Sequence, residues 1–403
     1  MAQAIYPKAT ARSACDKNET MLHLLTDSCT RLQTVMDRTK RATTTTLGEL
    51  PMKGSITVRD VATALGVSPS TVSRALSTSE LVAPRTRQRI IEKARELGYT
   101  PNNAARGLVT GRKGALGLVV PDLENPYFAS VTKGVQARAR AAGYSVFVAD
   151  SDEDSRVELE LVRKLKPQVD GIILCSSRMS DSELASLVDD ASVLLINRQM
   201  DGLPDITLND EEIVRQALEH LYALGHRHVG YAGGPTGSWS DRQRRLGIEQ
   251  TAPGLNGLDV LSLGSFAPVF GGGQSAADLA VAAGVTAVLA YNDLMALGII
   301  ARLHSRGINV PNELSVIGID DISAATMVSP ALTTVRAPLR RVGSAAVDRL
   351  IDSLDHKSVP SPTEYLPIEL VVRQSTSIPS SSAIKRPSGN VAGRNERKSH
   401  ASI

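Results

Sequence analysis

The sequence predicts an α/β protein with a small N-terminal helix-turn-helix module and a larger body made of two α/β subdomains. Residues 57–98 have the apolar spacing of helices throughout. Residues 115–375 instead alternate short Val/Ile/Leu runs with helical stretches, which is typical of βαβ units. With 403 residues, the chain is long enough for two or three domains.

The distribution of charge separates the same two parts of the chain. The net charge is only +3, with 45 basic and 42 acidic residues. Residues 55–113 hold 10 basic and 4 acidic residues, a net +6, whereas residues 114–375 hold 22 and 32, a net −10. A small basic module on a large acidic body points to a nucleic-acid partner for the module.

Composition and cysteine usage exclude other classes of protein. No apolar run is long enough to span a membrane, and no secretory signal is recognisable at the N-terminus. The three cysteines, Cys15, Cys29 and Cys175, form no close pair, so we expect no disulfide framework and no cysteine-based zinc site. A reducing cytoplasm fits this pattern.

The two ends of the chain lack the periodicity of packed elements. Residues 1–54 are interpreted as a disordered leader, or as an extension from an upstream start, with Met52 as the natural first residue. Residues 376–403 are rich in Ser, Lys, Arg, Asn and Gly and are predicted to be a disordered tail. Sequencing the N-terminus of the native protein would decide between the two interpretations of the leader.

Residues 55–101 are predicted to form the helix-turn-helix module. The first helix has apolar residues at positions 58, 61, 62 and 65 and ends at Gly66. Ser68 is placed to cap a second helix over 69–76, whose first residue is Pro69. A third helix starts near residue 84 and stops at Gly98. A glycine-containing turn between two short helices is the helix-turn-helix pattern.

The exposed face of the second helix carries small hydrogen-bonding residues and one arginine: Ser70, Thr71, Ser73 and Arg74. Such a surface fits a DNA major groove, and an arginine can bind the O6 and N7 atoms of guanine. Arginines and lysines of the third helix are placed to contact phosphates. A three-helix scaffold with a solvated basic face is the structural alternative.

Nine apolar runs in the body are predicted strands: 115–120, 145–148, 171–174, 193–196, 228–231, 259–263, 287–290, 315–319 and 333–335. Runs without polar alternation suit strands of parallel sheets buried on both faces. This number of strands is large for one sheet, so two subdomains are expected.

Two stretches of the module resemble the headpiece of the lactose/galactose repressor (LacI/GalR) family of transcriptional regulators. They are Ile56-Thr-Val-Arg-Asp-Val-Ala-Thr-Ala-Leu-Gly-Val-Ser-Pro-Ser-Thr-Val-Ser-Arg-Ala-Leu and Ala94-Arg-Glu-Leu-Gly-Tyr-Thr-Pro-Asn-Asn-Ala-Ala-Arg-Gly-Leu. The similarity extends over residues 56–375 and includes the later run Pro330-Ala-Leu-Thr-Thr-Val. The resemblance implies a double-stranded DNA operator as partner, a homodimer, and a location in the bacterial cytoplasm in association with the nucleoid.

The resemblance also assigns DNA-binding roles. Pro69, Ser70 and Arg74 would face the bases, with Pro69 against a thymine methyl because it has no side-chain donor. Residues 102–113 would hold a hinge helix and linker, in which Leu108 is the apolar wedge that kinks DNA. An interdomain linker anchored by Leu108 is the alternative. The predicted DNA-binding residues are Thr57, Pro69, Ser70, Thr71, Ser73, Arg74, Asn103 and Leu108.

Residues 114–375 resemble the type I periplasmic-binding-protein fold that the family uses to bind an effector and to dimerise. The first subdomain is expected to combine 114–213 with 311–337, and the second 214–310 with 338–375. Ligands of open α/β sheets lie at the carboxyl ends of strands, so the loops after the apolar runs hold the candidates. The predicted effector-binding residues are Tyr127, Phe128, Arg198, Trp239, Arg244, Phe266 and Asp293.

Each of these residues also has a structural interpretation. Tyr127 and Phe128 could belong to the core, and Trp239 could be a pocket wall or a core residue. Asp293 would match an effector-binding carboxylate and could also cap a helix. Asp320 and Asp321 are interpreted first as structural residues.

The motifs therefore predict a DNA-binding regulator, most simply a repressor, that a small metabolite controls. A sugar is the first expectation for the effector and a nucleobase the second. No catalytic motif, metal-ligand cluster or cofactor loop is present in the sequence, so no enzyme activity, metal or cofactor is expected. The alternatives are a sugar-binding uptake protein and an α/β enzyme.

Overall fold

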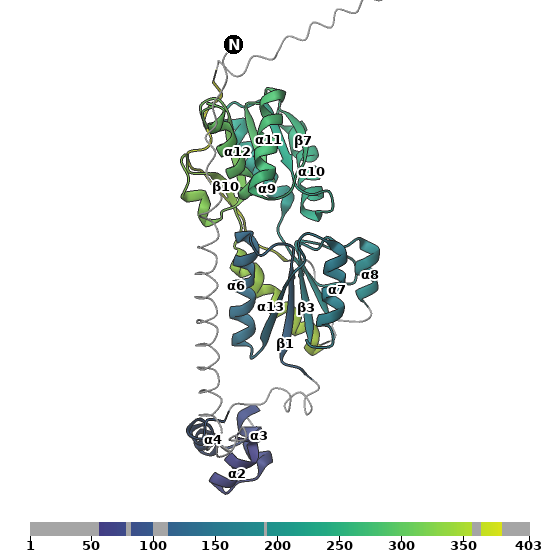
Figure 1. Ribbon diagram of the computed structural model, residues 1–403, viewed down its shortest axis with the longest axis vertical. Helices are drawn as coiled ribbons and strands as arrows, with labels where there is room; N and C mark the ends of the chain where they lie inside the picture. Colours follow the sequence, from purple (N-terminus) through teal and green to yellow (C-terminus); the bar gives the residue numbers. More distant parts are fainter. Residues whose placement is uncertain (1–55, 78–81, 100–111, 189–191, 357–363, 381–403) are drawn as a thin grey trace, which may run out of the picture. The chain divides into compact units, whose positions relative to one another are not determined.

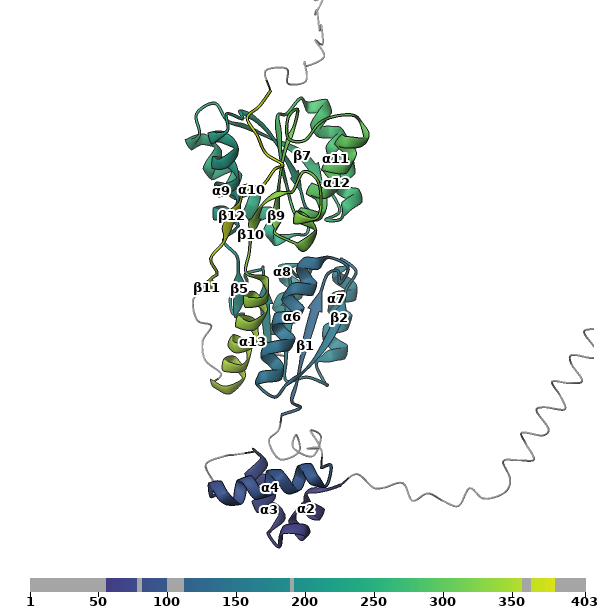
Figure 2. The ribbon, with the colours of Figure 1, turned by 90° about the vertical axis from the view of Figure 1, so that its left-hand side faces the viewer.

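The structure, a computed structural model, describes residues 56–77, 82–99, 112–188, 192–356 and 364–380 (Figures 1 and 2). Contacts between residues divide the chain into two units, Met1–Pro101 and Asn102–Ile403. We call the described part of the first unit the headpiece and that of the second unit the body, and describe each by itself.

The headpiece is a three-helix module built from α2 (Val58–Leu65), α3 (Pro69–Ser77) and α4 (Pro84–Glu96). A capping box starts α2, because the Thr57 hydroxyl accepts from the Asp60 backbone N–H at 3.4 Å and the Asp60 carboxylate accepts from the Thr57 N–H at 2.7 Å. Gly66 ends α2 in the left-handed region, at φ 65°. Val61, Val72 and Ile90, one from each helix, form the centre of the core. The predicted helix-turn-helix is confirmed.

The first subdomain of the body is a six-stranded parallel sheet of order β11-β5-β4-β3-β1-β2. Its strands are β1 (Ala115–Val120), β2 (Ser145–Asp150), β3 (Gly171–Cys175), β4 (Val193–Ile196), β5 (Asp205–Thr207) and β11 (Glu364–Tyr365). Helices α6 (Pro126–Ala141) and α13 (Leu339–His356) cover one face, and α7 (Ser155–Leu165) and α8 (Asp181–Val188) cover the other (Figure 1). Both faces are therefore buried, as the continuous apolar runs require.

The second subdomain is a six-stranded sheet of order β12-β10-β9-β8-β6-β7, parallel except for the β10–β12 pair. Its strands are β6 (His228–Gly233), β7 (Asp259–Ser265), β8 (Ala287–Ala290), β9 (Ser315–Asp320), β10 (Thr333–Arg336) and β12 (Glu369–Val371). Helices α9 (Asp210–Ala223) and α10 (Trp239–Thr251) cover one face, and α11 (Phe270–Ala283) and α12 (Asp293–Ser305) the other (Figure 2). Two short 3-10 helices, Ala252–Gly254 and Ser323–Thr326, complete it.

All nine predicted strands are present, but the predicted division of the body into subdomains is wrong. Residues 311–337 were assigned to the first subdomain, whereas β9 and β10 pair with β8 in the second sheet. Residues 338–375 were assigned to the second, whereas α13 packs on α6 and on β3, β4 and β5 of the first sheet. The chain crosses between subdomains three times: after β5, between β10 and α13, and between β11 and β12.

The predicted start of the tail at residue 376 is also wrong. The Ser377 backbone N–H donates to the Ser315 hydroxyl at 3.1 Å, and the Thr376 and Thr333 hydroxyls lie 3.1 Å apart. Ser375 is fully buried, and its hydroxyl accepts from the Thr333 backbone N–H at 2.8 Å and donates to the Val316 carbonyl oxygen at 2.5 Å, which joins β10 to β9. Residues 376–380 therefore belong to the body, and the rest of the predicted tail lies outside the described residues.

Two histidines bind this C-terminal segment, and they make stability depend on pH. The His226 Nε2 atom lies 2.9 Å from the Ser377 carbonyl oxygen, and the His220 Nε2 atom lies 3.0 Å from the Thr376 hydroxyl. Burial lowers the pKa of both imidazoles below their ordinary value of 6.5. The unfolded chain therefore takes up these protons at a higher pH than the folded chain.

We expect the contribution of these two histidines to the free energy of unfolding to fall as the pH decreases below about 6.5, by about 1.4 kcal/mol for each unit by which a pKa is depressed. Urea unfolding at about pH 7.5 and pH 5.5 measures the loss. The double variant His220→Gln/His226→Gln should show a smaller difference between the two pH values than the wild type. His228→Gln, at a site that is 54% exposed, is the matched control. An unchanged pH dependence in the double variant would contradict the prediction.

Helices α11 and α12 approach closely through glycines. A Cβ atom on Gly273 would lie 2.0 Å from the Met295 carbonyl oxygen, and one on Gly298 would lie 2.0 Å from the Phe270 carbonyl oxygen. Real contacts cannot be this short, so both positions require glycine. Within the run of three glycines at 271–273, helix packing thus explains Gly273.

Gly273→Ala is expected to destabilise the body by about 1–3 kcal/mol, because the two helices must separate to admit the methyl group. Gly271→Ala is the matched control on the same helix, since a Cβ atom there has no neighbour within 4 Å. The control should be neutral or slightly stabilising, because alanine favours helix. Urea unfolding of both variants measures the contrast, and equal stabilities would refute the packing argument.

Candidate functional site

The predicted DNA-binding residues of α3 lie on its surface. Pro69, Ser70, Ser73 and Arg74 are exposed, and Thr71 is half-buried. The Ser68 hydroxyl lies 2.8 Å from that of Ser70 and 2.7 Å from that of Thr71. It also accepts from the Thr71 backbone N–H at 3.1 Å, so it caps α3 as predicted. These hydroxyls hold the N-terminal end of α3 together in the headpiece.

The other headpiece residues with predicted contacts to DNA differ in where the structure places them. Thr57 is exposed and caps α2 with its side chain, as described above. Several basic residues of the third helix were expected to contact phosphates; of these, Arg87 donates from its Nε to the Ala75 carbonyl oxygen at 3.1 Å and connects α4 to α3. Arg74, Arg85 and Arg89 remain exposed. Asn103 and Leu108, with the predicted hinge helix, lie outside the described residues.

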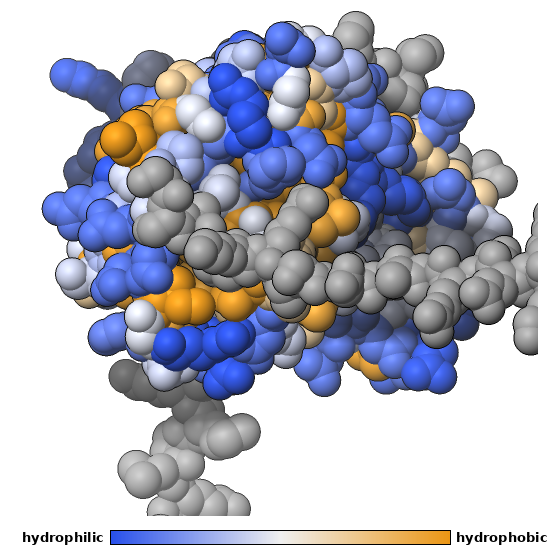
Figure 3. All heavy atoms as spheres, turned by 90° about the horizontal axis from the view of Figure 1, so that it is seen from above, coloured by the Kyte–Doolittle hydropathy of each residue, from blue (hydrophilic) through white to orange (hydrophobic). Residues whose placement is uncertain are grey.

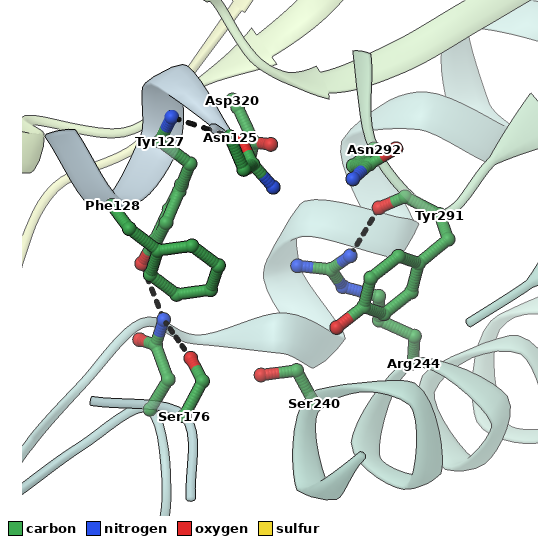
Figure 4. Close-up of a pocket in the computed structure, with 10 residues that line it drawn as sticks. Asn125, Tyr127, Phe128, Ser176, Ser240, Arg244, Tyr291, Asn292 and Asp320 are labelled. Carbon is green, nitrogen blue, oxygen red and sulfur yellow. Dashed lines mark hydrogen bonds between the residues drawn. The ribbon is translucent and has the colours of Figure 1, made fainter. Parts of the chain in front are cut away.

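The body contains a cavity between the carboxyl ends of its two sheets (Figure 4). Its volume is about 30 Å³. It is lined by Asn125, Tyr127, Phe128, Ser176, Asn197, Ser240, Arg244, Tyr291, Asn292 and Asp320. Most of these residues directly follow a strand or begin a helix, which is where open α/β sheets place their ligands.

We call this cavity the inner cavity. Aromatic rings form one of its walls. The Asn125 side chain accepts from the Tyr127 backbone N–H at 3.0 Å and starts α6, which presents Tyr127 and Phe128. The two rings meet edge to face with centroids 5.0 Å apart. The Asn197 amide donates to the Tyr127 hydroxyl, and burial raises the pKa of that phenol well above its ordinary value. The ring is thus held rigidly as a neutral surface.

Arg244 forms the opposite wall (Figure 4). Its Nε donates to the Asp210 carboxylate at 2.7 Å, with the two side chains only 7% and 3% exposed. Its Nη1 donates to the Tyr291 carbonyl oxygen, and its guanidinium carbon lies 4.8 Å from the centroid of the Tyr291 ring. Burial raises the pKa of Asp210 and Arg244 opposes this shift. Since a guanidinium stays charged, the Asp210 carboxyl is placed to compensate the charge of Arg244.

Three of the lining residues hold unfavourable backbone conformations. Ser176, Asn197 and Asp320, none of them glycine, have φ angles of 51°, 53° and 120°. Each such residue costs about 1–3 kcal/mol and persists where the surrounding structure imposes it. The Asn197 Oδ1 atom is also buried without a hydrogen-bond partner. Strain and an unsatisfied acceptor at one cavity are features of a binding site.

Asp293, the carboxylate predicted for the effector site, does not line this cavity, whereas Asp320 does. Asp293 is fully buried and turns into the second subdomain, where it accepts from the Thr334 hydroxyl at 2.6 Å and from the Ile322 N–H at 2.9 Å. Gly318 leaves room for it, because a Cβ there would lie 2.2 Å from the Asp293 carboxylate. Asp320 lines the cavity instead. Burial raises the pKa of both carboxyls, and the Asp293 charge raises that of Asp320 further.

Three more predicted effector residues do not line the inner cavity. The Arg198 guanidinium donates to the Asp181 carboxylate at 2.6 Å and to the Ser177 carbonyl oxygen at 3.1 Å, within the first subdomain. Trp239 is half-buried at the start of α10. Phe266 packs against the core of the second subdomain.

Of the predicted residues, the structure thus brings Tyr127, Phe128 and Arg244 together. The lining residues that were not predicted are small polar residues or lie near predicted ones in the sequence. They are Asn125, Ser176, Asn197, Ser240, Tyr291, Asn292 and Asp320. Ser176, Asn197 and Tyr291 directly follow apolar runs, and this position was a usable signal. In the part of the chain that the structure describes, there is no group of three His, Cys, Asp or Glu able to hold a metal, and no helix long and apolar enough to cross a membrane.

Comparisons with known proteins agree with this architecture. Residues 57–102 match the family described as bacterial regulatory proteins, lacI family, and residues 218–376 match a periplasmic binding protein-like domain. The transcriptional regulator PtxS of Pseudomonas plecoglossicida is 34% identical over 332 residues, which cover 80% of this chain and 96% of the relative. Catabolite control protein A of Priestia megaterium is 30% identical over 332 residues, with 80% and 99% covered.

Among solved structures, the lac repressor dimer bound to operator and the anti-inducer ONPF superposes with a TM-score of 0.69. It is 28% identical, and the match covers 80% of this chain and 99% of that one. The fold and the sites define a DNA-binding transcriptional regulator with a ligand-binding domain. The chain belongs to the lacI family of bacterial regulatory proteins, which are not enzymes. The enzyme and uptake-protein alternatives are thereby set aside.

Proposed function

We propose that the protein is a repressor that binds a specific operator as a homodimer and whose affinity for that operator is changed by a small polyhydroxylated effector, most simply a sugar. The effector binds in the inner cavity. The observation that carries the proposal is the composition of this cavity, which joins residues of both subdomains: Tyr127 and Asn197 from the first, Arg244 and Asp320 from the second. Occupancy therefore acts on the relative position of the subdomains.

The size of the cavity indicates how the effector enters. A water molecule needs roughly 10–15 Å³ of such volume, so about 30 Å³ holds about two waters and no sugar ring. The subdomains must separate to admit an effector, and they are joined by the three crossings of the chain. This opening is the movement that we expect to reach the DNA-binding module.

The lining chemistry favours a neutral ligand with several hydroxyl groups. Aromatic rings provide faces for an apolar side of a sugar, and amides, hydroxyls and Asp320 provide hydrogen-bonding atoms. Arg244 is compensated by Asp210, so it adds no net positive charge for an anion. The transcriptional regulator CelR, whose solved structure contains cellobiose, is 26% identical with a TM-score of 0.59.

Apolar side chains on the edge strands support a homodimer. Phe147 on β2 and Leu261 on β7 are 46% and 45% exposed, and Leu279 on α11 is 48% exposed. Figure 3 shows apolar residues gathered in patches among hydrophilic ones on the end of the body that carries the second sheet. Exposed apolar edges favour association with a second copy. Sedimentation equilibrium should give twice the chain mass of 42.8 kDa.

The proposed partner also places the protein in the bacterial cytoplasm, in association with the nucleoid. Selection from random DNA provides the operator, and fluorescence anisotropy at several salt concentrations measures the affinity. We expect operator affinity to fall steeply with salt, because each phosphate contact releases counterions. A chain that does not bind DNA at low salt would overturn the proposal. So would operator binding that no sugar, sugar phosphate or purine changes.

A further inference from the structure

A second cavity lies in the body at the carboxyl ends of the strands. This outer cavity has a volume of about 350 Å³, whereas the inner cavity has a volume of about 30 Å³. The loop after β2 contributes Glu153 and Ser155, and the loop after β3 contributes Arg178. The loops after β6 and β7 in the second subdomain contribute Thr236 and Pro268. Its volume is in the range of small-molecule sites.

Two hydrogen bonds form the boundary between the cavities. The Arg178 Nη1 atom, in the outer cavity, donates to the carbonyl oxygen of Ser176, which lines the inner one, at 2.9 Å. The Asn292 amide, in the inner cavity, donates to the carbonyl oxygen of Pro268, which lines the outer one, at 2.8 Å. The cavities therefore adjoin through residues of both subdomains.

Glu153 and Arg178 form the polar wall of the outer cavity. The Arg178 Nε and Nη2 atoms donate to the two carboxylate oxygens of Glu153 at 2.5 and 3.0 Å. The Arg178 side chain is 7% exposed and that of Glu153 is 27% exposed. A carboxylate has about four lone-pair sites, so Glu153 can accept further hydrogen bonds from a ligand.

The loop that presents Glu153 has a strained backbone. Asp152 and Glu153 have φ angles of 50° and 59°, although neither is a glycine. The Glu153 N–H donates to the Pro121 carbonyl oxygen at 2.9 Å, which holds the loop against the end of β1. Strain of this kind at a cavity wall points to a functional role for the side chain that it presents.

The charges of the outer cavity select against anions. Arg178 is the one cation among the described residues that line it, and Glu153 compensates its charge. The remaining lining groups are hydroxyls, prolines and small residues. A phosphate or carboxylate would find no uncompensated cation there, whereas neighbouring hydroxyl groups can donate to Glu153 and accept from Arg178.

We propose that the outer cavity is a second subsite of the effector site, which binds a neutral glycosyl unit through Glu153 and Arg178. The effector is then a neutral disaccharide or glycoside, with one unit in the outer cavity and the other in the inner cavity once that cavity has widened. This inference rests on the proposed function and specifies the class of its ligand.

Titration calorimetry with the full chain tests the subsite. The probes are cellobiose, maltose, lactose, trehalose and sucrose, their component monosaccharides, and glucose 6-phosphate. We expect one of these disaccharides to bind at least about tenfold more tightly than its monosaccharides. Glu153→Gln should weaken that disaccharide about tenfold or more, because hydrogen bonds to a charged group are lost, and should leave monosaccharide affinity within about twofold. Glu160→Gln, on the exposed face of α7, is the matched control.

Several results would overturn the subsite. They are equal affinities for disaccharides and monosaccharides, a preference for glucose 6-phosphate, equal losses for both ligand sizes in Glu153→Gln, or no binding of any neutral saccharide. If Glu153→Gln melts below the control, Thr236→Val replaces it: it should weaken the disaccharide about threefold or more, because one hydrogen bond between neutral groups is lost, and should leave monosaccharide affinity within about twofold. Operator affinity is measured in parallel. An operator response to a monosaccharide or to glucose 6-phosphate alone would overturn the subsite and leave the proposed function standing.

Discussion

Replacing Arg244 with methionine is expected to destabilise the body by about 3–5 kcal/mol, because it leaves the Asp210 carboxylate buried without its partner. The two side chains are 7% and 3% exposed and joined by a 2.7 Å hydrogen bond. The variant also loses the bond to the Tyr291 carbonyl oxygen and the cationic group beside the Tyr291 ring. Operator binding should then become insensitive to effector, since the wall of the inner cavity is gone.

Two further variants test the cause of this effect. Asp210→Asn/Arg244→Met removes both charges and should recover a large part of the lost stability. Arg215→Met breaks ion pairs to Glu212 and Glu219 on α9, where Arg215 is 43% exposed, and should cost at most about 1 kcal/mol. Urea unfolding of the three variants provides the comparison. If Arg244→Met were as stable as Arg215→Met, the buried pair of Asp210 on α9 and Arg244 on α10 would not stabilise the second subdomain.

Replacing Arg74 with alanine is expected to weaken binding to the operator by about 1–3 kcal/mol while leaving binding to random DNA nearly unchanged. Arg74 is the one exposed cation in the described part of α3, the helix that we expect to enter the major groove. Its loss removes a base contact, and the fold should remain intact because the side chain lies outside the core. Fluorescence anisotropy on operator and scrambled duplexes measures both affinities.

Arg89→Ala is the matched control for Arg74. Arg89 is exposed on α4, where we expect contacts to phosphates. Its removal should weaken operator and random DNA about equally and reduce the salt slope by about 1. If Arg74→Ala also lowered both affinities by the same factor, its role would be electrostatic, and α3 would not read the bases.

The elements were predictable where periodicity and local chemistry act together. The apolar spacing and Gly66 predict α2, and Ser68 and Pro69 predict the start of α3. The nine apolar runs predict the main strands because buried parallel strands need apolar residues on both faces. The strands β5, β11 and β12 have two or three residues each, too few for a pattern to be recognised.

The order of the elements in space was less predictable. Nothing in the local pattern of β9 and β10 says which sheet they join, because both sheets use the same kind of strand. Helix α13 returns to the first sheet through close contact with α6, where a Cβ atom on Gly134 would lie 2.0 Å from the Arg340 carbonyl oxygen. Such a long-range contact depends on the tertiary structure, so the division into subdomains was predicted wrongly.

The candidate site was predicted in part for a similar reason. The resemblance to the family, together with the rule that ligands lie after strands, led to Tyr127, Phe128 and Arg244, which line the inner cavity. The rule that ligands lie after strands does not distinguish Asp293 from Asp320 as the carboxylate of the site, because both lie at or just after the end of a strand. Only the structure shows that Gly318 makes room for Asp293 inside the second subdomain and that the backbone at Asp320, with φ 120°, turns that carboxylate to the cavity.

The central claim is that a small molecule bound between the two subdomains controls operator binding. It is tested most directly by the operator affinity of the full chain, measured by anisotropy with and without a saturating saccharide that calorimetry shows to bind. We expect operator affinity to change about fivefold or more, and saccharide affinity to change by the same factor when operator is present. Equal operator affinities with and without the bound saccharide would contradict it.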